Sequence, residues 1–144
     1  MNANTPRYKS EEEYRLEKEA LREQHQRWRK WLMGRRGFVQ IYYDEFLEIV
    51  RRENVSGNAV RLYLFLAKHA DWETGELRVS VQRIEGFFDC SKRTVLNWLK
   101  ELEEAKLIKR IQAAPNRFAF TYLLPYHDEF FEHEKHKAAM LDRD

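Results

Sequence analysis

Four adjacent residues combine two hydroxyl groups with two cationic side chains, in the segment SKRT at residues 91–94. An amphipathic run follows at once, in which Val95, Leu99 and Leu102 recur at spacings of four and three. This spacing predicts a helix that buries these three apolar side chains. Helical geometry then turns the polar residues of the first turns outward. These outward residues are Lys92, Arg93, Thr94, Asn97 and Lys100.

Side chains of these types suit a nucleic acid. The free N–H groups of a helix N-terminus bind phosphate, and Ser91 and Thr94 add short hydrogen-bond donors. Arg93 and Asn97, one turn apart, carry the groups that recognise guanine and adenine edges in the major groove. The acidic residues of the segment 101–104 come at the far end of the helix, away from any bound phosphate. The alternative interpretation is a helix cap followed by solvated residues.

A second predicted helix precedes this one. Ser80 can cap it, and Val81, Ile84 and Phe88 lie on one face. Two helices joined by a short break at residues 89–90 indicate a helix-turn-helix. Gln82 and Arg83, at the start of the first of them, are expected to touch the flanking DNA backbone.

The periodicity changes after Lys106. Residues 107–112 and 117–124 are rich in β-formers, and the Pro-Asn pair between them indicates a turn. A two-stranded wing is therefore predicted, with basic residues that could contact phosphates or the minor groove. These wing residues are Lys109, Arg110 and Arg117.

The elements upstream are predicted by the same rules. Residues 38–43 alternate as in a short strand, and Asp44 can cap a helix with Phe46, Leu47 and Val50 inside. Ser56 begins a largely buried helix. A turn centred on Thr74-Gly75 follows it, and then a very short strand at residues 77–79.

The order of these elements is that of a winged helix, and two segments resemble known proteins. FFDCSKRTVLNWLKELEEAKLIKRI (residues 87–111) resembles the recognition-helix-to-wing segment of prokaryotic winged helix-turn-helix proteins. The earlier GFVQIYYDEF and VRLYLFLAKHADWETGEL resemble the domain entry of plasmid and phage replication initiators and of DnaD-type primosome proteins. The resemblance covers about residues 37–125. It departs from the family at Lys106, where a glycine usually closes the helix, so a different helix end is expected here.

This resemblance implies a mainly α fold with a small β-wing (α+β) and sequence-selective binding to double-stranded DNA. The role implied is replication initiation on a plasmid or phage, or transcription regulation. A protein-docking module, of a primosome or partition type with replication or partition proteins as partners, is the alternative. We expect residues 1–36 to form an N-terminal helical extension, residues 37–125 the winged helix-turn-helix domain, and residues 126–144 a C-terminal helix.

Composition restricts the other classes of function. The chain has 144 residues, is 43% apolar and carries a net charge of +2, so any attraction for DNA must be local. The single cysteine, Cys90, excludes an internal disulfide, and either a redox role or a buried turn position is open to it. No apolar run is long enough to span a membrane, and a cytoplasmic protein is expected. No nucleophile elbow or phosphate loop occurs, so neither an enzyme nor a cofactor is predicted.

The terminal extensions contain the remaining features. Residues 10–34 predict one long helix, capped by Ser10 with Glu13 in a capping box and stopped by Gly34. Its apolar seam is too narrow to fold alone, so we expect a homodimer through the terminal helices. The alternative is a monomer in which the two terminal helices of one chain pack on each other. The residues expected in this contact are Tyr14, Leu21, Trp28, Trp31, Leu32, Phe130 and Phe131. Three histidines at positions 127, 133 and 136 are explained by a polar helix, and no metal is expected.

Overall fold

The structure is a computed structural model that describes residues 8–35, 37–112 and 119–141. The chain divides into two compact units, Met1–Gly37 and Phe38–Asp144. The first unit holds helix α1 (Glu11–Leu32), and Ser10 caps it as predicted, with its Oγ accepting a hydrogen bond from the Glu13 N–H at 3.2 Å. None of the 22 residues of α1 is buried. The helix ends at Leu32, two residues before Gly34.

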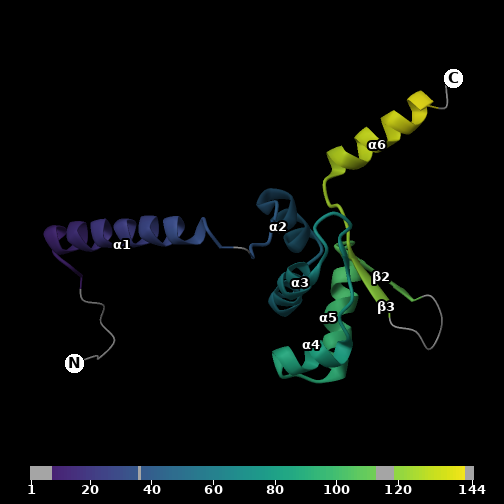
Figure 1. The fold of residues 1–144 in the computed structure, drawn as a ribbon, viewed down its shortest axis with the longest axis horizontal. Coiled ribbons are helices and arrows are strands. Elements are labelled where there is room, and N and C mark those ends of the chain that lie inside the picture. Colours follow the sequence, from purple (N-terminus) through teal and green to yellow (C-terminus); the bar gives the residue numbers. More distant parts are fainter. Residues whose placement is uncertain (1–7, 36, 113–118, 142–144) are drawn as a thin grey trace. The chain divides into compact units, whose positions relative to one another are not determined.

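The second unit has the element order of a winged helix (Figure 1). Its elements are α2 (Tyr43–Arg52), α3 (Gly57–His69), β1 (Glu76–Leu77), α4 (Val81–Phe88), α5 (Lys92–Glu104), β2 (Ile108–Gln112), β3 (Ala119–Leu123) and α6 (Asp128–Leu141). The described strands form an antiparallel sheet in the order β1-β3-β2. This confirms the predicted fold class. In the described ranges, no helix is both long and apolar enough to cross a membrane.

Serine caps set the starts of three helices in this unit. In each case the serine Oγ accepts a hydrogen bond from the backbone N–H three residues later, at 3.1 to 3.2 Å. This satisfies one of the donors that every helix N-terminus leaves free. The three caps are Ser56 of α3, Ser80 of α4 and Ser91 of α5.

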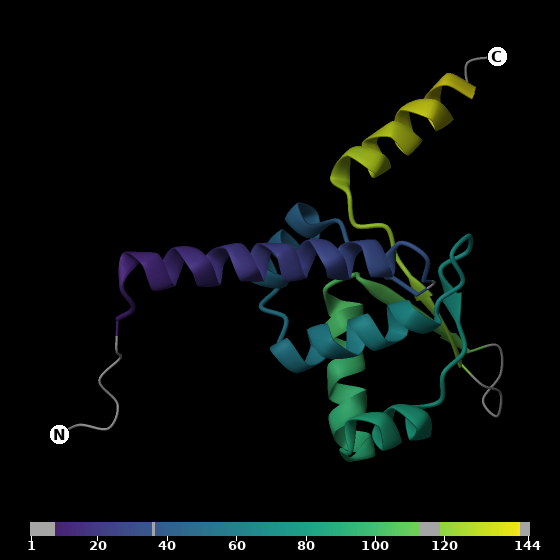
Figure 2. The same ribbon diagram turned by 60° about the vertical axis from the view of Figure 1, so that its left-hand side comes forward.

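One core joins α3, α4, α5 and the base of the sheet. Leu62 and Leu66 of α3 are at most 1% exposed, as are Ile84 of α4 and Ile108 of β2. Figure 2 shows α4 and α5 meeting at one end of the unit, with the β2–β3 strands beside α5. The core therefore fixes the orientation of α5 about its own axis.

The expected strand at residues 38–43 is wrong. Residues 38–42 have no regular secondary structure and lie outside the sheet, and α2 begins at Tyr43. The Tyr42 N–H donates to the Tyr126 hydroxyl at 3.0 Å, so a side chain takes the place of a neighbouring strand. The predicted cap at Asp44 is also wrong, because Tyr42 is the N-cap and Asp44 lies in the first turn. Leu47, expected inside, is 60% exposed.

The different helix end expected at Lys106 is not found. Lys106 has φ 59°, the left-handed conformation in which a glycine is usual. The Lys106 N–H donates to the Glu103 carbonyl and the Leu107 N–H to the Leu102 carbonyl, both at 3.0 Å. These two bonds form a Schellman motif, so α5 closes through a left-handed lysine. Asn54 and Asp89 hold the same conformation after α2 and α4.

Candidate nucleic-acid interface

The two faces of α5 have different surroundings. Val95, Leu99 and Leu102 are at most 2% exposed and pack in the core, as predicted. The residues predicted to point outward are exposed, except Thr94, which is half-buried. The exposed residues are Lys92, Arg93, Asn97 and Lys100. The exposed face of the first two turns therefore combines these polar side chains with Leu96, which is 40% exposed.

Ser91 and Thr94 share their hydroxyl groups. Ser91 Oγ accepts from the Thr94 N–H at 3.2 Å and lies 2.9 Å from Thr94 Oγ1. The cap interpretation of Ser91 is thus correct, but the cap uses only part of the hydrogen-bonding capacity of the pair. One of the two hydroxyl protons remains available to an external acceptor such as a phosphate oxygen.

The cations of the first turn are not neutralised. Within the part of the chain that the structure describes, Lys92 and Arg93 make no ion pair. Lys100 lies two turns after Lys92. Its Nζ is 3.8 Å from Oε1 of Glu104, which lies four residues later on the same helix. The positive charge of α5 is therefore concentrated at its N-terminal end, where the partial charge of the helix has the same sign.

Lys109 and Arg110 lie on opposite faces of the wing. Arg110 pairs with the buried Thr121, and directly opposite residues of an antiparallel pair share one face. That face also carries Ile108, which is in the core, so Arg110 extends the side of the sheet that packs on the helices. Lys109 pairs with Tyr122 on the other face. Arg117 lies outside the described residues.

Tyr122 brings an acidic group to the face of Lys109. Its hydroxyl donates to Glu76 Oε2 at 3.2 Å, and Glu76 is opposite Tyr122 in the sheet. A carboxylate beside Lys109 opposes the approach of a phosphate. Of these two described wing residues, Lys109 is exposed beside a carboxylate, whereas Arg110 is half-buried on the other face.

The start of α4 carries one exposed cation, Arg83, and one exposed amide, Gln82. Both lie in the first turn after the cap Ser80. Burial, followed by the positive charges of Arg83 and Lys68, lowers the pKa of His69. The charge of Arg83 on α4 thus acts on His69, the last residue of α3.

The turn between α4 and α5 is held by backbone hydrogen bonds and by packing, and the half-buried Cys90 takes part in both. Asp89 adopts the left-handed conformation, and the half-buried Cys90 donates its N–H to the Glu85 carbonyl at 3.2 Å. The Phe88 ring meets the Trp98 ring edge to face at 5.7 Å. These contacts fix the angle at which α5 leaves the turn.

Sequence reasoning missed the role of Glu101. It was expected only as an acid at the far end of α5, yet its carboxylate binds the start of α3. Oε1 accepts from the Ser56 N–H at 2.9 Å, and Oε2 accepts from Ser56 Oγ at 2.8 Å. A carboxylate at a helix N-terminus also has a favourable interaction with the helix dipole. Glu101 thus fastens α5 to α3.

The histidines do not form a metal site in the described ranges, where no group of three suitable ligands occurs. His127 instead lies beside α2, with Nε2 at 3.5 Å from Glu45 Oε2. Its ring stacks on Tyr126 at 5.3 Å. These contacts join the start of α6 to α2.

Comparison with known proteins agrees with the fold. Residues 53–108 match the model of a family described as a helix-turn-helix domain. This segment runs from the end of α2 to the first residue of β2, so it contains α3, α4 and α5. No curated protein matches the chain.

Two solved structures are similar to it. One is described as the N-terminal domain of a DNA binding protein, at 13% identity and a TM-score of 0.48, covering 92% of this chain and 96% of that one. The other is described as the structure of a Rep-DNA complex, at 15% identity and a TM-score of 0.48, covering 76% of this chain and 92% of that one. Both likenesses are too remote to assign a function.

Proposed function

We propose that this chain is a non-catalytic protein that binds double-stranded DNA with sequence selectivity, using α5 as the recognition helix. The observation that carries the proposal is the exposed face at the start of α5. There the cations Lys92 and Arg93, which make no ion pair within residues 8–35, 37–112 and 119–141, lie on the same helix face as the exposed amide of Asn97. This helix is the second of the helix-turn-helix, the position from which such domains enter the major groove.

The side chains divide into two roles. Arg93 and Asn97 have the forked donor and amide geometry that reads base edges. Lys92, Lys100 and Arg110 supply positive charge for phosphates, with the Ser91–Thr94 hydroxyl pair at the helix N-terminus. Gln82 and Arg83 extend the phosphate contacts along α4. Replication initiation and transcription regulation both require this interface, so the proposal is made for DNA recognition itself.

The test begins with selection of bound sites from a random duplex pool, followed by affinity measurements on the best site and on a scrambled site. For the double variant Arg93→Ala/Asn97→Ala, we expect the preference for the selected site to fall by about 100-fold, since each good base contact contributes about 1–3 kcal/mol of discrimination. Affinity for the scrambled site should change much less. Unchanged preference would refute the role of α5.

The wing is tested by a matched pair of neighbouring residues. Arg110→Ala should weaken both sites alike and lower the slope of log affinity against log salt by about 1, because one phosphate contact is lost. Lys109→Ala, on the opposite face, should change neither quantity appreciably. If the chain fails to retard any duplex at low salt, the domain is a protein-docking module and the proposal is wrong.

A further inference from the structure

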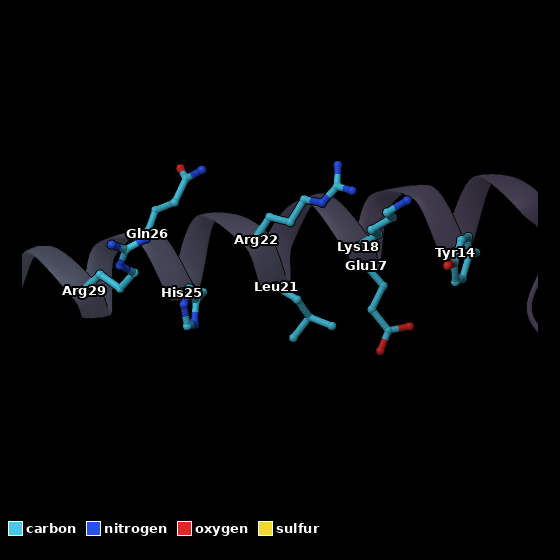
Figure 3. A pocket seen from close by; sticks show the side chains of 8 residues that line it. All are labelled: Tyr14, Glu17, Lys18, Leu21, Arg22, His25, Gln26 and Arg29. Atoms are coloured by element: carbon cyan, nitrogen blue, oxygen red, sulfur yellow. The ribbon is translucent and has the colours of Figure 1, made fainter. Parts of the chain in front are cut away.

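Among the described residues of its own unit, nothing covers the face of α1 that carries Tyr14, Leu21 and Trp28. These three side chains are 61%, 57% and 53% exposed, and they recur every seven residues. Figure 3 shows one side of this helix, on which the Leu21 and His25 side chains point the same way, while Arg22 and Gln26 point to another side. His25 also meets Trp28, with ring centroids 5.5 Å apart. A seam of this width matches a single partner helix.

Charge is divided between the two halves of α1. Residues 11–19 hold five acidic and two basic side chains, a net charge of −3. Residues 20–32 hold one acidic and four basic side chains, a net charge of +3. The net charges of the two halves are equal and opposite, and the midpoint of the helix lies next to Leu21. A second copy of the same helix is therefore complementary only when it runs in the opposite direction.

We propose that α1 pairs antiparallel with α1 of a second copy of this chain, with Leu21 near the two-fold axis. In this arrangement each acidic half lies along the basic half of the partner, whereas a parallel pair sets like charges side by side. The seam residues of both copies become buried together. Trp31 lies at the edge of this seam, where the Arg35 guanidinium already covers its ring at 3.5 Å.

The interface is tested on the full-length chain by sedimentation at several concentrations. Leu21→Glu should raise the dissociation constant of the dimer at least about 100-fold, because two leucines lose their burial and two like charges meet on the axis. Leu16→Glu is the matched control, since Leu16 is 54% exposed and lies about 140° around the same helix. It introduces the same residue and should leave the dimer intact.

The direction of pairing is tested by distances between spin labels in a Cys90→Ser background. In an antiparallel pair, labels at Glu12→Cys are separated by about 30 Å along the axis, and labels at Ala20→Cys by only about 5 Å. In a parallel pair, both axial offsets are close to zero. Dimerisation should also weaken with added salt, by roughly tenfold between 50 mM and 500 mM.

Three results overturn the proposal. A monomeric mass at tens of micromolar means that α1 packs on another part of its own chain or stays exposed to solvent. An undiminished dimer of Leu21→Glu moves the interface elsewhere, for example to Phe130 and Phe131 of α6, which are 43% and 45% exposed. Equal label distances at both positions refute the antiparallel direction.

Discussion

Replacing Glu101 by alanine tests whether α5 and α3 are fastened by one carboxylate. The side chain accepts two hydrogen bonds from Ser56, at 2.9 and 2.8 Å, and both residues are partly buried. A hydrogen bond to a charged group contributes about 1.5–3 kcal/mol when it is buried. Water replaces part of this at a partly open site, so we expect Glu101→Ala to lower the free energy of unfolding by about 2 kcal/mol.

Thermal and urea unfolding followed by circular dichroism measure this loss. For a domain of about 100 residues, 2 kcal/mol corresponds to a fall in Tm of roughly 8 °C. Glu101→Gln keeps one carbonyl oxygen for the Ser56 N–H and should lose about half as much. Glu103→Ala is the control, because Glu103 is exposed on the same helix and should cost less than about 0.5 kcal/mol. Equal losses for Glu101→Ala and Glu103→Ala would refute the reasoning.

Two further predictions concern the stability of the winged-helix unit. Lys106→Gly should raise the free energy of unfolding by about 1 kcal/mol, because glycine adopts the left-handed conformation without strain, whereas Lys106→Ala should not; urea midpoints would show the difference. Burial raises the pKa of Tyr63, so the folded chain keeps this proton after the unfolded chain loses it, and stability should fall as pH rises above about 10. Tyr63→Phe should flatten that fall in unfolding curves recorded between pH 9 and 11, and an unchanged slope would contradict the assignment.

Features decided by neighbouring residues were predictable from the sequence. The caps at Ser10 and Ser80 depend only on a hydroxyl and an N–H three residues away, and the structure confirms both. The inward face of α5 follows from spacing alone, because a helix has one period whatever surrounds it. The turn at Gly75 was equally local, and this residue has φ 72°.

Features decided by distant residues were not predictable. The alternation at residues 38–43 is compatible with a strand, but a strand needs a neighbour, and the backbone at Tyr42 finds the Tyr126 hydroxyl 84 residues away. The bond from Glu101 to α3 could not be predicted, because its partner Ser56 is 45 residues earlier in the chain. Lys109 and Arg110 had to lie on opposite faces of a strand, but which of them faces the helices depended on how the sheet packs. In each case the missing information was a tertiary contact.

The two faces of α5 have a consequence for how such a protein can evolve. The residues that would read DNA are exposed, whereas the residues that hold the helix in place are at most 2% exposed. Exchange of Arg93 or Asn97 for another polar residue should alter stability by less than about 0.5 kcal/mol. A new preferred sequence could therefore arise by one substitution, with no compensating change in the core. Selection can act on target choice and on foldability as nearly independent traits of the same helix.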